Sequence, residues 1–194
     1  MRYSKEHNEQ ARNRLLSTGG SHAKKHGFGD SGMDALAGAA GVTTGSLYKH
    51  FDGKSDLFAA LIRSELQRTA KRFSAIAPGD LEAATKALAA YLSLNHVKHP
   101  EAGCALPSLT PEVARADEAV RHAFQSEVIA IHAIVANRFT GSSDTAWSLI
   151  AQSVGAVMLA RAMRDERVRR QLLGATARKS LALLGKPVGA ATRR

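Results

Sequence analysis

Residues 41–51 read GVTTGSLYKHF and gather hydroxyl, phenol, ammonium and imidazole groups on one short segment. The segment begins like a turn and continues like a helix, because Thr43 can cap a helix that starts at the next residue. No Ser–His–acid arrangement, phosphate loop or paired metal motif is found in the sequence. These groups are hydrogen-bond donors and acceptors of the kind that contact phosphates and base edges, so nucleic acid is the first partner to consider.

The composition agrees with an anionic partner. The chain has 194 residues and 27 Lys and Arg against 17 Asp and Glu, a formal net charge of +10. Such a surplus suits nucleic acid, although a proteome rich in Ala and Arg would also produce a basic protein. No apolar run is long enough for a membrane span, no signal-peptide pattern opens the chain, and the single cysteine excludes an internal disulfide. We therefore expect a cytoplasmic protein without a cofactor.

The hydrophobic periodicity predicts an all-α fold of about nine helices. They are expected at about 5–25, 33–40, 44–50, 54–76, 81–98, 105–110, 111–139, 145–164 and 167–184. Gly19-Gly20 should weaken the first helix locally. Ser31, with Asp34 three residues later, has the spacing of a helix N-cap, and Pro111 suits a first helical turn. The predicted domains are 1–53 and 54–185, followed by a flexible tail at 186–194.

Two short helices joined by 41–43 make a helix-turn-helix, a motif whose second helix enters the major groove of DNA. Leu47 and Phe51 are spaced i, i+4 and can anchor that helix inward. Gly45 has no side chain, so the backbone can approach DNA closely. The alternative is that the aromatic residues are core and the polar residues are a solvated face.

Residues 33–61, MDALAGAAGVTTGSLYKHFDGKSDLFAAL, closely resemble the DNA-binding region of TetR-family transcriptional regulators. The matching pattern is A-G-V, a capping hydroxyl, Gly, a small hydroxyl residue, L-Y-x-H-F, a short turn and K-x-x-L. The resemblance implies a three-helix DNA-binding domain followed by a divergent helical ligand-binding and dimerisation domain. It places Thr44, Gly45 and Lys49 nearest the bases. It places Ser46, Tyr48, His50 and Lys54 nearest the phosphates, and Ser31 and Thr43 complete the expected DNA-binding set.

Reading paired half-sites requires two-fold symmetry. The segment 144–163, DTAWSLIAQSVGAVMLARAM, carries an apolar seam with small residues that permit close approach. The expected dimer interface is Trp147, Ile150, Ala151, Val154 and Met158, with Leu172 on the following helix. The resemblance places a dimer-forming four-helix bundle on these last two helices. An internal helix pair would give the same seam.

The resemblance also implies a small-molecule effector, whose identity the sequence does not give. The expected pocket residues are Leu92, Cys104, Leu106, Phe124, Ile131 and Val157, although each would also suit a plain core. Cys104 follows His96, His99 and Glu101 in the pattern H-x-x-H-x-E-x-x-C. It could be a buried packing residue, a thiol that senses oxidants or electrophiles, or a metal ligand.

The function that these observations favour is a ligand-responsive transcriptional repressor. It would bind palindromic double-stranded operator DNA as a homodimer and be released by a small molecule. The alternatives are a repressor that senses oxidants or electrophiles through Cys104, a helical enzyme, and an architectural DNA binder that is indifferent to sequence. Activation instead of repression would depend on where the operator lies.

Overall fold

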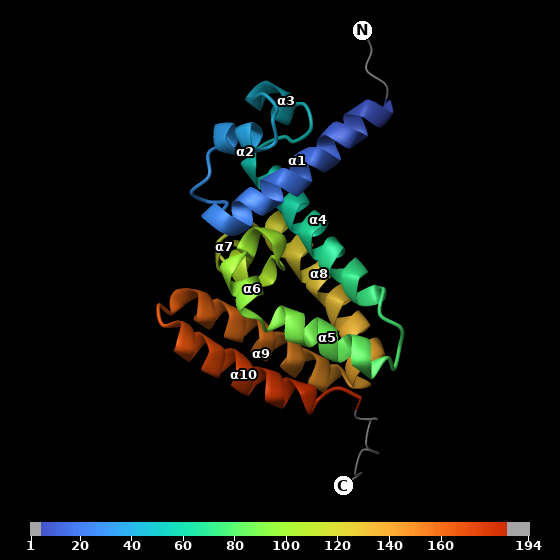
Figure 1. Ribbon diagram of the computed structural model, residues 1–194. Helices are drawn as coiled ribbons and strands as arrows, with labels where there is room; N and C mark the ends of the chain where they lie inside the picture. The colour runs from blue at the N-terminus through green and yellow to red at the C-terminus, as the bar shows by residue number, and fades with distance from the viewer. Residues whose placement is uncertain (1–4, 186–194) are drawn as a thin grey trace. The chain divides into compact units, whose positions relative to one another are not determined.

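The structure, a computed structural model, describes residues 5–185 and is all-helical over that range, without a strand (Figure 1). Residues 5–185 form ten α-helices: α1 (Lys5–His26), α2 (Met33–Ala39), α3 (Thr44–Tyr48), α4 (Lys54–Ser74), α5 (Leu81–Tyr91), α6 (Leu94–Lys98), α7 (Leu106–Val113), α8 (Glu118–Val135), α9 (Ser143–Ala162) and α10 (Glu166–Leu181). A short 3-10 turn, η1 (Pro100–Ala102), precedes α7, and a π-helical turn, η2 (Ala136–Thr140), extends α8. Within residues 5–185 no helix has both the length and the apolar character that a bilayer crossing requires.

The chain forms two compact units. Within the described residues, the first unit combines 5–67 with 100–127, and the second combines 68–99 with 128–185. Helices α4 and α8 each contribute residues to both units. The domain boundary between residues 53 and 54 stays a prediction, and the tail predicted at 186–194 lies outside the described residues.

One predicted helix, 81–98, is two helices in the structure. Helix α5 ends at Tyr91, and Ser93 begins α6 as its N-cap, accepting a hydrogen bond from the backbone N–H of His96 at 3.2 Å. The apolar pattern continues across this break, because Leu92 and Val97 are both buried. The hydrophobic periodicity therefore did not reveal the break, because the Ser93 cap lies inside a continuous apolar pattern.

The long helix predicted from Pro111 to residue 139 was also wrong at its start. Pro111 lies inside α7, which ends two residues later at Val113. Helix α8 begins only at Glu118, where Asp117 accepts a hydrogen bond from the backbone N–H of Val120 at 3.1 Å. A carboxylate is a strong helix cap, so α8 begins after Asp117 and not at Pro111.

The first unit is built on α1 and α4. Leu15 of α1 and Leu61 of α4 are almost fully buried, and Phe28 stacks on Phe58 with ring centroids 4.2 Å apart. Helices α2 and α3 pack in sequence, α2 against α1 and α3 against α2 (Figure 1). Together these contacts give the two short helices a rigid base.

A charged pair is buried between α1 and α4. The Lys24 ammonium lies 2.7 Å from a carboxylate oxygen of Glu65, with side-chain exposures of 0% and 1%. Lys24 also donates a hydrogen bond to the backbone carbonyl of Gly103 at 2.9 Å. A Cβ atom at Gly20 would lie 2.5 Å from the other Glu65 oxygen, so the carboxylate occupies the space that a side chain there would need. Helix α1 runs unbroken through Gly19-Gly20, and the second glycine makes room for the ion pair.

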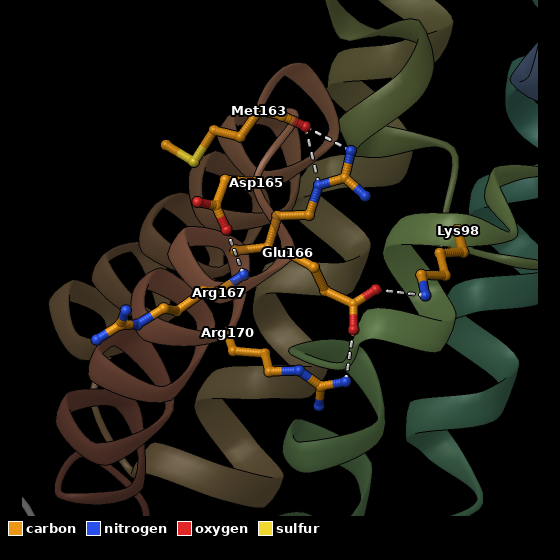
Figure 2. A network of polar contacts seen from close by, with 7 residues as sticks. Lys98, Met163, Asp165, Glu166, Arg167 and Arg170 are labelled. Atoms are coloured by element: carbon orange, nitrogen blue, oxygen red, sulfur yellow. Dashed lines mark hydrogen bonds and ion pairs between the residues drawn. The ribbon is translucent and has the colours of Figure 1, made fainter.

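In the second unit, α9 and α10 lie side by side and are joined by a polar turn (Figure 1). Figure 2 shows that Glu166 lies between Lys98 of α6 and Arg170 of α10, with each ion pair at 2.6 Å. Hydrogen bonds from Lys98 and then Arg170 hold the pKa of the Glu166 carboxyl below its usual value. Asp165 caps α10 by accepting a hydrogen bond from the backbone N–H of Arg167 at 2.7 Å. These exposed contacts fix the start of α10.

The two neighbouring glycines of α1 allow a matched test of the buried pair. Gly20→Ala should lower the free energy of unfolding by about 1–3 kcal/mol, because the methyl group collides with the Glu65 carboxylate. Gly19→Ala should raise it by up to about 1 kcal/mol, because its Cβ would meet Leu61 at an ordinary 3.5 Å and alanine favours a helix. Urea unfolding followed by circular dichroism measures both. Equal effects at the two positions would contradict this account.

Candidate nucleic-acid interface

The turn between α2 and α3 is fixed by backbone geometry. Gly41 has a φ of 67°, a left-handed conformation that favours glycine, and it ends α2. Val42 donates its backbone N–H to the carbonyl of Ala37 at 3.0 Å. Thr43 then caps α3 by accepting a hydrogen bond from the backbone N–H of Ser46 at 3.1 Å. The predicted cap is confirmed.

Helix α3 has one buried face and one polar face. Leu47 and Phe51 are 0% and 2% exposed, so the predicted i, i+4 anchor pair is confirmed. Tyr48 is 56% exposed, Lys49 is exposed, and His50 is half-buried. The helix ends at Tyr48, with Lys49 as its C-cap, rather than at residue 50. Its polar side chains therefore rest on an apolar base that holds them at the surface.

Gly45 is not required by the packing of the protein itself. A Cβ atom at this position would find its nearest neighbour, the hydroxyl of Thr43, 4.0 Å away. Gly45 also has no left-handed φ angle that would demand a glycine. The free space lies on the exposed side of α3, where a partner could come close to the backbone.

Lys54, predicted to meet a phosphate, contacts the loop between α1 and α2. Its ammonium donates to the carbonyl of Gly29 at 2.7 Å and lies 5.4 Å from the centroid of the Phe28 ring. Glu112 of α7 accepts hydrogen bonds from the backbone N–H groups of Phe28 at 3.0 Å and Gly29 at 2.5 Å. A cation and a carboxylate from distant parts of the sequence thus hold this loop, and the proposed phosphate contact would use other hydrogens of the same ammonium.

The predicted cap at Ser31 was wrong. The N-cap of α2 is Gly32, and it makes no side-chain cap hydrogen bond. Ser31 is 4% exposed, and its hydroxyl donates to the carbonyl of Gly27 at 2.6 Å. The short loop folds back on itself, so the serine closes the loop instead of capping the helix. Its predicted DNA contact stays a prediction.

Two residues near α3 were missed by the sequence reasoning. Asp34, in the first turn of α2, accepts a hydrogen bond from the hydroxyl of Thr44 at 2.5 Å. Arg12 of α1 places its guanidinium 5.2 Å from the centroid of the Phe51 ring. Ten and thirty-nine residues separate these partners in the sequence, so only the packing of the helices brings them together.

Two titratable groups of the first unit have displaced pKa values. Burial, followed by the neighbouring His26, lowers the pKa of His22 on α1, and the two imidazole rings are 4.7 Å apart. The hydroxyl of Ser55, followed by the N–H of Val120, lowers the pKa of Asp117. Asp117 therefore stays ionised while it caps α8 and binds α4. Among residues 5–185 no cluster of three His, Cys, Asp or Glu side chains could hold a metal ion.

The residues predicted to line a ligand pocket are divided between the two units. Leu92, Ile131 and Val157 are buried in the second unit. Cys104 and Leu106 are buried in the first unit, where Phe124 is half-buried. Cys104 is the single cysteine of the chain and is only 5% exposed. The assignment of these residues to a pocket stays a prediction.

The predicted dimer residues lie on the less buried face of α9. Trp147 is 41% exposed, Ala151 is exposed, and a Cβ atom at Gly155 would meet no atom within 4 Å. Ile150, Val154 and Met158 are half-buried, as is Leu172 on α10. The opposite face of α9 is buried through Ala146, Leu149, Ala156, Val157 and Ala160. Helix α9 is thus apolar on both sides, although within residues 5–185 only one side is fully buried.

Comparison with solved structures shows the fold. The reduced form of NemR from Escherichia coli is 21% identical, with 92% of this chain and 100% of that chain covered and a TM-score of 0.71. A regulatory protein TetR from Rhodobacter sphaeroides is 20% identical over 90% and 98% of the two chains, with a TM-score of 0.70. A TetR-family transcriptional regulator from Pectobacterium atrosepticum is 23% identical over 95% and 99%, with a TM-score of 0.63. No curated protein matches the chain.

Residues 15–61 match the model of the bacterial regulatory proteins of the tetR family. This range begins within α1, includes α2, the turn and α3, and ends within α4. It therefore contains every element of the polar surface described above. Proteins of this family are DNA-binding transcription factors rather than enzymes. Residues 15–61 therefore match the amino-terminal helix-turn-helix domain of the tetR family of bacterial regulatory proteins, and the chain shares the fold of solved TetR-family regulators.

Proposed function

We propose that this protein is a cytoplasmic, ligand-responsive transcriptional repressor that binds a palindromic operator as a homodimer and is released by a small-molecule effector. The observation that carries the proposal is the surface of α3, whose polar side chains are exposed or half-buried above a buried Leu47 and Phe51. A short helix with small residues at its start fits the major groove, which is about 12 Å wide. The match of residues 15–61 to the tetR family of bacterial regulatory proteins supports DNA binding through this helix.

On the DNA, we assign direct base contacts to Thr44 and Lys49 and a close backbone approach to Gly45. Ser46, Tyr48, His50 and Lys54 are assigned to the phosphates, because contacts to the backbone position a protein while base contacts select the sequence. Thr43 belongs to the same surface as the exposed cap of α3.

The dimer is proposed to form through α9 and α10. The exposed Trp147 and the open space at Gly155 mark an apolar helix face that a second copy could cover. A second copy would also supply a second α3 helix, and the half-sites that such a pair reads lie one helical turn apart, about 34–36 Å on B-DNA. A symmetric dimer would thus cover the exposed face of α9 and provide the two recognition helices that a palindromic operator requires.

For an effector to control DNA binding, a structural change must reach α3, and we propose that α7 of the first unit transmits it. Glu112 of α7 binds the backbone of the loop that precedes α2, so a shift of α7 would move that loop. Two arrangements of α7 would then differ in how α2 and α3 are presented. Sensing through Cys104 is not favoured, because a reactive thiol needs access and this one is buried.

Specific DNA recognition can be measured by fluorescence anisotropy on DNA from beside the gene, against scrambled DNA, over a salt series. The operator should bind about a thousandfold more tightly or better. Lys49→Ala should relax base preference at one position per half-site by about tenfold, whereas Lys54→Ala should weaken binding to all sequences and flatten the salt slope. Melting curves control for the loss of the Lys54–Gly29 contact. Uniform losses in both variants would show that the division of roles is incorrect.

The dimer can be tested by sedimentation velocity on Gly155→Arg. An arginine at the centre of the interface would leave an unpaired charge without water, and the dimer should weaken by about 100-fold or more. Ala89→Arg on α5 is the matched control, since it adds the same charge at an exposed position outside α9 and α10. A dimer that tolerates Gly155→Arg as well as the control would place the interface elsewhere.

A further inference from the structure

The hydrogen bond between Thr44 and Asp34 determines what Thr44 can offer to DNA. Thr44 is the first residue of α3, and its hydroxyl lies 2.5 Å from a carboxylate oxygen of Asp34 in α2. Asp34 is exposed and Thr44 is half-buried, so both side chains border the surface at the start of α3. The bond joins α2 to the start of α3.

The polarity of this bond follows from the groups that make it. An ionised carboxylate accepts hydrogen bonds and has no proton to donate. The threonine hydroxyl has a single proton, and donating it to Asp34 leaves only two lone pairs. Toward a partner, Thr44 can therefore only accept, and the negative charge of Asp34 beside it reinforces this preference.

The major groove presents a matching difference between bases. Cytosine and adenine expose amino groups, which are donors, whereas guanine and thymine expose only acceptors and, in thymine, a methyl group. An accepting hydroxyl gains a hydrogen bond from an amino group. Facing O6 and N7 of guanine or O4 of thymine, it brings lone pairs against lone pairs.

We propose that Asp34 makes Thr44 a selective reader of amino bases. At the operator position beneath Thr44, the contacted strand carries cytosine or adenine, and guanine or thymine is rejected. This inference rests on the proposed function, because it concerns the same DNA-binding surface. It assigns a specificity role to Asp34, which need not touch the DNA to determine the selection.

The test begins with selection of high-affinity sites from randomised DNA by the full-length protein. The position read by Thr44 is the one whose preference disappears in Thr44→Val, a substitution that keeps the shape of the side chain but removes the hydroxyl. Binding to the four single-base versions of that position is then measured for each variant. The wild-type protein should prefer amino over keto bases by about tenfold.

Asp34→Ala frees the hydroxyl of Thr44 to donate as well as to accept. The preference between amino and keto bases should fall to within about twofold, while binding to all sequences stays the same or strengthens as a negative charge is removed. Asp52→Ala is the matched control, because it removes an exposed carboxylate just after α3 and leaves Thr44 bonded to Asp34. It should change overall affinity in the same way and leave the base preference intact.

A double variant separates a specific effect from general damage. In the Thr44→Val background, Asp34→Ala should produce no further change in base preference, because the hydroxyl on which Asp34 acts is gone. An unchanged preference in Asp34→Ala, a keto preference in the wild-type protein, or no position affected by Thr44→Val would each overturn the inference. Failure of the wild-type protein to select any sequence would instead overturn the proposed function.

Discussion

The buried ion pair between Lys24 and Glu65 constrains the whole first unit. Removing two charges from water costs several kcal/mol per ion, and only a close partner offsets that cost. The pair therefore tolerates little sliding of α1 along α4, because a displaced carboxylate would leave the buried ammonium without its counter-charge. Helix α2 packs on α1, and α3 packs on α2. The position of α3 therefore depends on the ion pair indirectly, through α1 and α2.

The loop between α1 and α2 also constrains the position of α2, through hydrogen bonds to its backbone. It lies between the cation of Lys54 and the carboxylate of Glu112, which bind neighbouring carbonyl and N–H groups of the backbone. These contacts bind the backbone of the loop, while the loop's own Phe28 side chain is buried against Phe58. The 27–30 segment, GFGD, is held in place by residues that lie 24 or more positions later in the chain.

Local patterns predicted the helix-turn-helix well. Gly41, the Thr43 cap and the buried Leu47 all follow from rules that span four or five residues. The same rules failed where a short-range cap interrupts a continuous apolar pattern, as at Ser93. They could not predict that Asp34 bonds to Thr44 or that Gly20 accommodates Glu65, because those contacts join residues that tertiary packing alone brings together. The resemblance supplied the expected DNA contacts, and Ser31 shows that a residue at the expected place can serve the loop instead.

The space shared by Gly20 and Glu65 also restricts the history of the chain. A lineage that acquires a larger residue at position 20 while the carboxylate is present passes through a crowded intermediate. A lineage that loses the carboxylate first passes through one in which the buried Lys24 ammonium has no counter-charge at position 65. Either order passes through a less stable intermediate. Positions 20, 24 and 65 should therefore be inherited as a set, and they should be replaced together by neutral residues that pack well.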